Sequence, residues 1–161
     1  MCIRDRYFDN EDQESKIPYV IETSIGLDRM FLAVLSASFT EEKLPDGSER
    51  TVLRIPPALA PIKASILPLV KKDGLPEKSR EIFQALKFDF NMQFDEKDAI
   101  GKRYRRQDAI GTPYCITVDH QTLEDNTVTI RERDSMEQER VAIDELRAII
   151  GKRVSFSNLL Q

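Results

Sequence analysis

Residues 17–24, IPYVIETS, alternate in a way that predicts a β-strand with Val20, Glu22 and Ser24 on one face. Glu22 and Ser24 would then lie about 7 Å apart along the backbone. The strand leads into a largely apolar stretch that reaches Phe39. A carboxylate at position 22 of such a stretch requires an explanation.

A helix is expected directly after this strand. Apolar positions recur there at i, i+3, i+4 and i+7, with Ser24 or Thr23 available as the N-cap. The stripe consists of Leu27, Met30, Phe31, Val34, Leu35 and Ser38. Residues 44–48, LPDGS, suit a tight turn. Because residues 54–61, RIPPALAP, contain three prolines, we expect a domain boundary near residues 50–60.

After this boundary the hydrophobic pattern alternates between segments typical of strands and segments typical of helices. Residues 62–70 form an apolar run of strand length, and residues 75–86 have helical spacing. Residues 88–94, FDFNMQF, alternate strictly and predict a strand. We expect its aromatic row, Phe88, Phe90 and Phe94, to pack in the core rather than to form a platform for nucleobases.

A second helix is predicted over residues 99–110, with Asp98 as its N-cap and Gly111 as its stop. Residues 113–119 and 127–133 then predict two antiparallel strands joined by a polar loop.

A last helix is predicted from a capping box of Ser135 and Gln138 to Gly151. Its apolar stripe contains Met136, Ile143, Leu146 and Ile150. This order of strands and helices predicts an α/β layer structure with a mixed sheet.

Composition limits the function. The 161 residues, 40% hydrophobic and 32% charged, suffice for one domain or one domain plus part of another, and no apolar run is long enough to cross a bilayer. Cys2, Cys115 and His120 cannot supply a tetrahedral metal site, and we expect a cytoplasmic protein without a membrane partner. The net charge of −4 argues against a nucleic-acid partner, but the cluster GKRYRRQ at residues 101–107 keeps one possible.

Arg29 and Glu22 are the first candidates for chemistry. A cation in the first turns of a helix opposes the helix dipole unless an anion is bound, and a phosphate would meet that need beside Gly26. The alternative is that Arg29 simply pairs with Asp28 or with a neighbouring carboxylate. Glu22 would accept a ligand ammonium group with Ser24 beside it, or would form an internal ion pair.

The basic cluster of the second helix is the other candidate. Lys102, Arg105 and Arg106 fall on one side of the helix, and Arg103 falls with Gln107 on another. The exposed charges can meet phosphates while Tyr104 stacks or packs; the alternative is a solvated helix face with Tyr104 in the core. Candidate readers of base edges are Asp108, Thr117 and Arg131.

The stretch YVIETSIGLDRMFLAVL resembles the third signature motif of class II aminoacyl-tRNA synthetases, in the form found in dimeric glycyl-tRNA synthetase. Three further stretches, LRIPPALAPIKASILPL, IGKRYRRQDAIGTPYCITVD and VTIRERDSMEQERVAIDEL, resemble the C-terminal anticodon-binding domain of that family. The resemblance covers residues 17–151 in order. It implies an α/β fold: an anticodon-binding domain with a mixed five-stranded sheet and three flanking helices, preceded by a strand-helix remnant of the catalytic domain.

The resemblance also implies residue roles. Arg29 is the catalytic arginine that contacts the ATP phosphates. The glycine-binding set is Glu22, Ser24 and Gly26, and the ATP-binding set is Gly26, Asp28 and Arg29, in which Asp28 has no separate role. Many relatives have proline in place of Thr23, which affects local stiffness only. The tRNA-binding set is Lys102, Arg103, Arg105, Arg106, Asp108 and Arg131.

Three segments are expected. Residues 1–6, MCIRDR, resemble a back-translated transposon end and are expected to be an assembly scar. Residues 7–57 are expected to be the catalytic remnant, and residues 58–161 the anticodon-binding domain. The first and second motifs of the class are missing from the sequence, so we expect no catalysis by this chain alone.

The implied partners are glycine tRNA, glycine, ATP with Mg²⁺ and a second subunit of a homodimeric full-length enzyme. Two other functions remain open from the sequence. One is a standalone accessory module that binds RNA without catalysis, and the other is a plain α/β interaction domain.

Overall fold

The computed structural model describes residues 6–19, 21–45 and 47–160, and the chain divides into two compact units, residues 1–31 and 32–161. In the first unit, β1 (Tyr7–Asp9) and β2 (Glu14–Lys16) form an antiparallel hairpin that the sequence pattern did not predict. Helix α1 (Leu27–Ser38) begins in the first unit and ends in the second.

The expected strand over residues 17–24 is wrong. Its described residues, 17–19 and 21–24, are exposed and lie in neither strand nor helix. A strand is stable only beside a hydrogen-bonded neighbour, and none of the sheets formed by the described residues includes this segment.

Helix α1 begins at Leu27, as its apolar spacing predicts, but the expected cap is wrong. The N–H of Met30 donates to the carbonyl of Gly26 at 3.1 Å. Gly26, rather than Ser24 or Thr23, therefore holds the position before the first helical residue.

A second hairpin follows α1. Strands β3 (Phe39–Lys43) and β4 (Glu49–Leu53) pair antiparallel. The N–H of Leu44 donates to the carbonyl of Ser48 at 2.8 Å, and the N–H of Gly47 donates to the carbonyl of Leu44 at 2.9 Å. The predicted tight turn is confirmed by these two bonds.

A five-stranded mixed sheet, in the order β6-β5-β7-β8-β9, forms the centre of the second unit. Its strands are β5 (Ala64–Pro68), β6 (Met92–Phe94), β7 (Tyr114–Val118), β8 (Thr127–Glu132) and β9 (Gln138–Ala142). β5 runs parallel to β6 and β7, whereas β8 is antiparallel to β7 and β9. The mixed five-stranded sheet of the expected fold class is confirmed.

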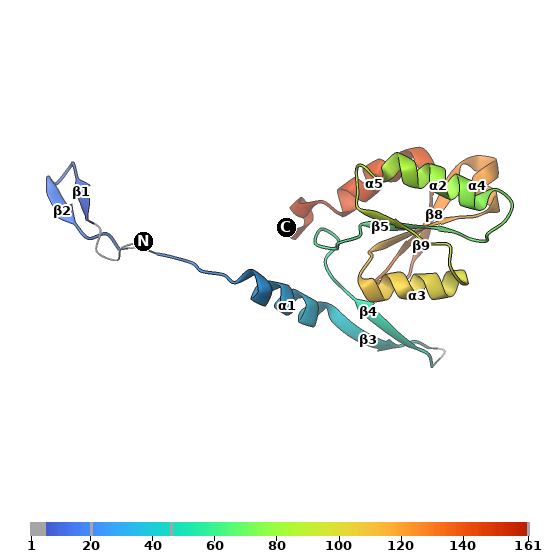
Figure 1. Cartoon of the computed structure of the whole chain (residues 1–161), viewed down its shortest axis with the longest axis horizontal. Helices are drawn as coiled ribbons and strands as arrows, with labels where there is room; N and C mark the ends of the chain where they lie inside the picture. Colours follow the sequence, from blue (N-terminus) through green and yellow to red (C-terminus); the bar gives the residue numbers. More distant parts are fainter. Residues whose placement is uncertain (1–5, 20, 46, 161) are drawn as a thin grey trace. The chain divides into compact units, whose positions relative to one another are not determined.

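Helices cover both faces of this sheet (Figure 1). α2 (Leu75–Leu86), α4 (His120–Asp125) and α5 (Leu146–Arg153) lie on one face, while α3 (Ile100–Ile110) and the β3–β4 hairpin lie on the other. Short 3-10 turns cover Ile143–Glu145 and Phe156–Leu159. The three expected flanking helices are α2, α3 and α5, and α4 occupies the segment expected to be a polar loop.

The main core fills the space between the sheet and the α2–α5 layer. Its buried members include Ile66, Leu75, Ile82, Leu86, Ile116, Val128, Ile130, Leu146 and Ile150. Burial of these side chains is the main force that holds the two layers together.

The helix expected from Ser135 to Gly151 is only partly formed. Residues 138–142 pair with β8 as strand β9, because the ladder with β8 satisfies their backbone groups and outweighs the local capping pattern. Met136 adopts φ 61° in the turn before β9. Helix α5 starts at Leu146 and runs through Gly151, which is therefore not its stop.

The strand expected over residues 88–94 is shorter than predicted, since only Met92–Phe94 pairs with β5. Phe90 and Phe94 pack against the core as expected. Phe88 does not, because its side chain is 89% exposed beside the ammonium group of Lys87.

Of the two predicted ends of α3, the start is wrong and the stop is confirmed. Its N-cap is Ala99 rather than Asp98. Gly111 ends the helix with φ 86°, a left-handed conformation that favours glycine. A Cβ at Gly111 would also lie 3.2 Å from the carbonyl oxygen of Leu53, so the hairpin approaches the helix end closely.

The proline-rich stretch at residues 54–61 joins two parts of one compact unit, because β4 before it and β5 after it both belong to residues 32–161. Ile55, Ala58 and Ala60 are buried within it. The assignment of residues 7–57 and residues 58–161 to two different domains stays a prediction. Residues 1–5 of the expected scar lie outside the described residues. No helix among the described residues has the length and apolar character of a membrane span.

Asp119 joins α4 to the β8–β9 pair. Its carboxylate accepts the N–H of Thr122 at 3.0 Å, and its own N–H donates to the Thr122 hydroxyl at 3.1 Å, which forms a capping box. Two N–H groups of Arg140 donate to the same carboxylate at 2.8 and 2.9 Å. The hydrogen bonds from Arg140 and then from Thr122 outweigh burial and lower the pKa of Asp119 to about 2.

Replacement Asp119→Asn keeps a capping oxygen but removes the charge, and should lower the free energy of unfolding by about 1–2 kcal/mol at neutral pH. Because the folded pKa of about 2 lies below the ordinary value of 3.8, this contribution is present above pH 3.8 and is lost as the pH falls towards 2. Urea unfolding at several pH values measures it. A difference from wild type that stays constant down to pH 2 would contradict the assignment, and Glu124→Gln, on the exposed side of α4, is the control.

Candidate nucleic-acid interface

Within the segment that resembles the third motif, residues 19–35 (the motif-like segment), the candidate site residues all lie exposed in the first unit. Glu22 and Ser24 belong to the unpaired segment, while Asp28 and Arg29 lie in the first turn of α1. Within the described part of this unit, no ion pair joins Asp28 to Arg29 and none engages Glu22. A Cβ placed on Gly26 would lie 3.8 Å from Cδ of Arg29, so the structure brings these two residues together.

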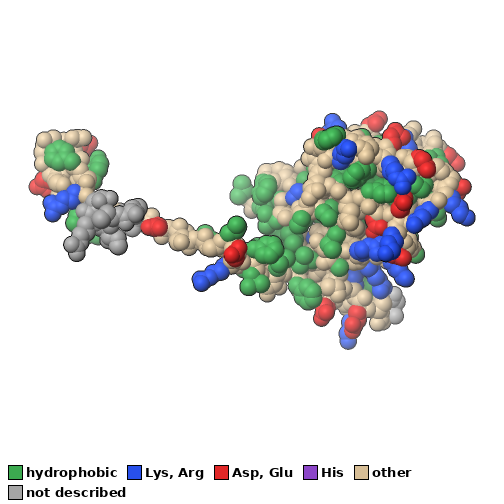
Figure 2. All heavy atoms as spheres, viewed as in Figure 1, with side chains coloured by type: hydrophobic (Ala, Val, Ile, Leu, Met, Phe, Trp, Pro, Cys, Tyr) green, Lys and Arg blue, Asp and Glu red, His purple; other side chains and the backbone are tan. Residues whose placement is uncertain are grey.

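Helix α3 carries the basic cluster, and its residues separate as the helical period predicts. Lys102 and Arg105 are exposed, Arg106 is half-buried, and Arg103 is buried with Gln107. Lys and Arg side chains are interspersed with carboxylates over the face of the second unit shown in Figure 2. Whether a cation of α3 can meet a bound anion therefore depends on whether it already has a partner inside the fold.

Arg103 is buried and is hydrogen-bonded inside the fold. It is 2% exposed and donates to the carbonyls of Pro68 at 2.5 Å, Leu69 at 3.2 Å and Asp98 at 3.1 Å. Burial lowers its pKa, but a guanidinium remains protonated at any physiological pH. Arg103 thus ties the chain leaving β5 to the loop before α3, and no nucleic acid can reach its charge directly.

Arg106 is neutralised by neighbouring carboxylates. Its guanidinium donates to Asp95 at 2.8 and 3.0 Å and to Asp98 at 3.3 Å, and these hydrogen bonds raise its pKa. Arg105 donates to the hydroxyl of Ser48 at 3.0 Å. No ion pair engages Lys102 or Arg105 within the described part of the chain, so these two cations are the members of the cluster best placed to meet an anion.

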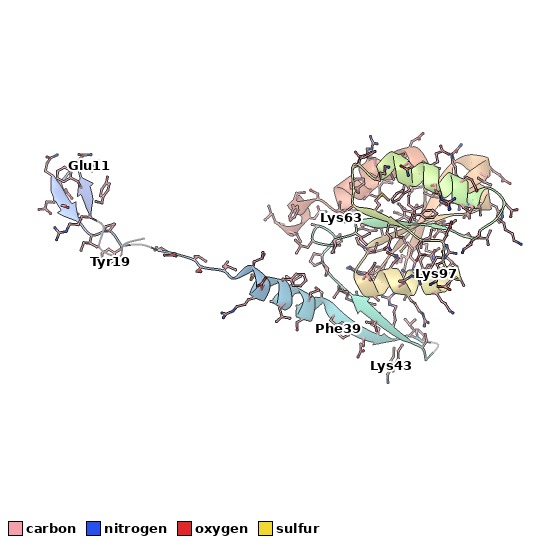
Figure 3. The ribbon with its side chains drawn as sticks, in the orientation of Figure 1. Glu11, Tyr19, Phe39, Lys43, Lys63 and Lys97 are labelled. Atoms are coloured by element: carbon pink, nitrogen blue, oxygen red, sulfur yellow. The ribbon has the colours of Figure 1, made fainter. Side chains whose placement is uncertain are left out.

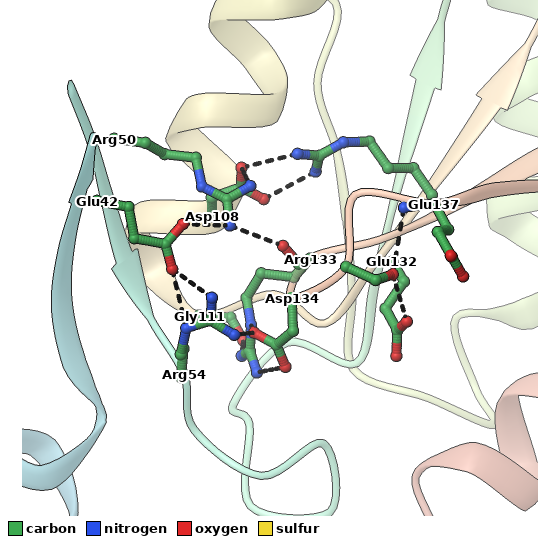
Figure 4. A network of polar contacts seen from close by, with 11 residues as sticks. Glu42, Arg50, Arg54, Asp108, Gly111, Glu132, Arg133, Asp134 and Glu137 are labelled. Atoms are coloured by element: carbon green, nitrogen blue, oxygen red, sulfur yellow. Dashed lines mark hydrogen bonds and ion pairs between the residues drawn. The ribbon is translucent and has the colours of Figure 1, made fainter. Parts of the chain in front are cut away.

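Asp108 is the centre of a buried polar network (Figure 4). It is fully buried and accepts hydrogen bonds from Arg131 of β8 at 2.9 and 3.1 Å and from Arg50 of β4 at 3.4 Å. Arg50 also donates to the carbonyl of Arg133 at 3.0 Å and pairs with Glu42 at 3.2 Å. One carboxylate therefore joins α3, the sheet and the β3–β4 hairpin.

The remaining candidate readers are also engaged inside the fold. The guanidinium of Arg131 lies 4.8 Å from the centre of the Tyr104 ring, and the hydroxyls of Tyr104 and Thr117 are hydrogen-bonded at 2.6 Å. Burial would lower the pKa of Arg131, but its hydrogen bonds to Asp108 and the charge of that carboxylate raise it. Asp108, Thr117 and Arg131 therefore build the layer beneath α3.

Sequence reasoning missed Arg50 and Arg133, both of which are buried. Arg133 donates to the carbonyl of Gly111 at 2.9 Å and to the carboxylate of Asp134 at 2.8 Å. The signal for Arg50 was its alternation with Val52, since both point inward from β4.

Removal of the Asp108 carboxylate should destabilise the second unit strongly. Asp108→Ala leaves the guanidiniums of Arg131 and Arg50 buried without their shared partner, so a loss of about 3–5 kcal/mol is expected in the free energy of unfolding. Urea unfolding measures this loss. The control Glu81→Ala breaks the exposed pair with Lys78 and should change stability by at most about 0.5 kcal/mol; an equal effect of the two variants would contradict the central role of Asp108.

Comparison with known proteins places this arrangement in a family. A family model described as an anticodon binding domain matches residues 63–153, which include the whole five-stranded sheet. The chain belongs to the anticodon-binding domain family. Lys102 and Arg105 thus lie on a helix of this domain.

Three relatives show how far the likeness extends beyond the anticodon-binding domain. Glycine-tRNA ligase of Clostridium tetani (strain Massachusetts / E88) is 57% identical over 150 residues, 93% of this chain and 32% of the relative. The ligase of Clostridium beijerinckii is 55% identical over 150 residues, with the same shares. That of Rhodopirellula baltica is 52% identical over 155 residues, 94% of this chain and 29% of the relative. The chain spans about a third of the length of these relatives.

Two solved structures share the fold at low identity. The RNA binding domain of threonyl-tRNA synthetase from Cryptosporidium parvum Iowa II has a TM-score of 0.57 and 22% identity, covering 62% of this chain and 25% of that one. Prolyl-tRNA synthetase from Cryptosporidium parvum has a TM-score of 0.59 and 20% identity, covering 71% of this chain and 30% of that one. These likenesses agree with the layered α/β fold of the anticodon-binding domain.

Proposed function

We propose that this chain is the C-terminal part of a glycine-tRNA ligase, a class II synthetase that uses ATP to attach glycine to its tRNA through a glycyl-adenylate. The observation that carries the proposal is the 57% identity to a glycine-tRNA ligase over 93% of the chain. Its share of the relative, 32%, supports the interpretation as a fragment.

In this proposal the anticodon-binding domain recognises the anticodon of glycine tRNA through the α3 side of the sheet. Lys102 and Arg105 attract the phosphates, because they are exposed and no carboxylate neutralises them within the described residues. The other members of the expected tRNA-binding set act indirectly. Arg103, Asp108 and Arg131 hold α3 in place, and Arg106 is restrained by Asp95.

The motif-like segment would contribute to the active site of the longer enzyme. Arg29, beside Gly26 at the start of α1, would balance the charge of the ATP phosphates, with Asp28 in the same turn. Glu22 would hold the ammonium group of glycine, with Ser24 as its polar neighbour. Mg²⁺ would accompany ATP in the full enzyme. The full enzyme would be a cytoplasmic homodimer.

Binding of glycine tRNA tests the proposed recognition. The chain should bind glycine tRNA more tightly than the same tRNA with an exchanged anticodon at every salt concentration of a titration series. The double variant Lys102→Ala, Arg105→Ala should weaken binding to both RNAs and reduce the slope of log affinity against log salt by about 2.

Arg147→Ala is the control for an arginine outside the proposed interface, because Arg147 is exposed on α5, across the sheet from α3, where it pairs with Asp89. Equal affinity for the two tRNAs would favour a plain interaction domain. An unchanged slope in the double variant would remove Lys102 and Arg105 from the interface.

The purified 161-residue chain should show no glycine-dependent exchange between ATP and pyrophosphate. The physical reason is that Glu22 and Arg29 lie on exposed chain, so neither water exclusion nor a second set of phosphate contacts supports the transition state. A longer ligase such as that of Clostridium tetani serves as the positive control. Exchange above background that disappears in Arg29→Ala would overturn the expectation.

A further inference from the structure

Helix α1 runs directly into the β3–β4 hairpin, because the helix ends at Ser38 and β3 begins at Phe39. Figure 3 labels Phe39 and Lys43, the two ends of β3. Ser38 is buried, and its carbonyl accepts the N–H of Arg54, the residue that follows β4, at 2.6 Å. This hydrogen bond holds the start of β3 and the end of β4 together at the end of the helix. We call Ser38 and Arg54 the helix joint.

Glu42 of β3 connects the helix joint to the buried network beneath α3 (Figure 4). This side chain is half-buried and accepts a hydrogen bond from Nε of Arg54 at 3.0 Å. The same carboxylate pairs with Arg50 at 3.2 Å, and Arg50 in turn contacts Asp108 of α3 at 3.4 Å. Arg54 also pairs with Asp134, in the turn between β8 and β9, at 3.3 Å. Glu42 therefore lies between the arginine of the joint and the arginine that reaches α3.

The turn of the hairpin lies beside the outer face of α3, where Arg105 donates to the hydroxyl of Ser48 at 3.0 Å. In the proposed function Lys102 and Arg105 hold phosphates, so a phosphate at Arg105 would lie against this turn. RNA would therefore favour the hairpin docked on α3 over any state in which the hairpin has moved away. A ligand that binds only the docked state makes the undocked state rarer, in proportion to the ligand concentration divided by the dissociation constant.

We propose that Glu42 is a positioning residue that couples the helix joint to RNA bound on the outer face of α3. Separation of Arg54 from Ser38 would also pull Arg54 away from Glu42, so the joint opens together with the hairpin rather than by itself. RNA that holds the hairpin on α3 then also holds the joint closed.

The inference rests on the proposed function and adds a connection between its two sites. Helix α1 carries Arg29 in its first turn, so a restraint at Ser38 acts on the helix that the proposed function assigns to ATP. The competing explanation is that Glu42 only stabilises the hairpin locally. In that case RNA on α3 would leave the joint unaffected.

Amide hydrogen exchange, measured with and without the anticodon stem-loop of glycine tRNA, separates these two explanations. The reporter is the backbone N–H of Arg54, which donates to Ser38, and the amides of α3 report binding itself. With the stem-loop at about 100 times its dissociation constant, exchange of the reporter amide in the wild-type chain should slow by about 10- to 100-fold.

Glu42→Gln keeps the size of the side chain but removes the charge that pairs with both arginines. In this variant the reporter amide should exchange faster than in the wild type and should no longer respond to the stem-loop, while the α3 amides still slow. Glu41→Gln is the matched control, because it makes the same change at the next residue of β3, which is exposed and has no ion pair within the described part of the chain. Glu41→Gln should retain the wild-type response.

A second variant covers the case in which Glu42→Gln does not fold. Arg54→Gln removes the other partner at a side chain that is 38% exposed, keeps the reporter N–H and should abolish the response in the same way. A response of the reporter amide that persists in every folded variant of the pair would overturn the positioning role of Glu42.

Failure of the coupling and failure of the proposed function give different results. If the wild-type chain prefers the glycine stem-loop and the α3 amides slow but the reporter amide does not, the coupling is overturned and the proposed function stands. If the chain binds the stem-loop no more tightly than one with an exchanged anticodon, the proposed function fails and the coupling fails with it.

Discussion

The placement of α3 and of the β3–β4 hairpin on the sheet depends on one buried carboxylate. Asp108 accepts hydrogen bonds from Arg131 on the sheet and from Arg50 on the β3–β4 hairpin, so three elements distant in sequence meet at a single charge. A buried ion of this kind is tolerated only when its hydrogen bonds are satisfied. A shift of α3 would take the carboxylate away from Arg131, and a shift of the hairpin would break the contact of Arg50 with Asp108. The network therefore specifies how α3 and the hairpin sit on the sheet, in addition to whatever stability it supplies.

Fixing the inner side of α3 also determines its outer side. Arg103, Gln107 and Asp108 all make their contacts inside the fold, so the 3.6-residue period leaves Lys102 and Arg105 facing away from the sheet. The contact of Arg105 with Ser48 places the hairpin turn beside this outer face. The position of the proposed RNA-binding surface is thus a consequence of the contacts that α3 makes inside the fold.

Local periodicity predicted those elements that are defined by their own sequence. Helices over residues 75–86 and 99–110, and the apolar strands β5 and β7, follow from spacing alone. Residues 17–24 and 138–142 were wrongly predicted because strand formation depends on a partner elsewhere in the chain: the first segment has none among the described residues, and the second pairs with β8. In the site, the exposure of Lys102 followed from the helical period. The burial of Arg103 could not be predicted, since its acceptors at Pro68 and Leu69 lie more than thirty residues away.

The net charge of −4 is compatible with the proposed RNA-binding role because the charge is not spread evenly, and the carboxylates in α3 and in the loop before it have cationic partners. Asp95 and Asp98 restrain Arg106, Asp108 lies within the interior, and Asp119 is bound by Arg140. Each such pair is neutral from a distance, so the local potential beside α3 is set largely by its exposed cations Lys102 and Arg105. Salt screens separations beyond about 10 Å at 0.1 M, so the total charge of the chain matters less to binding than this local excess.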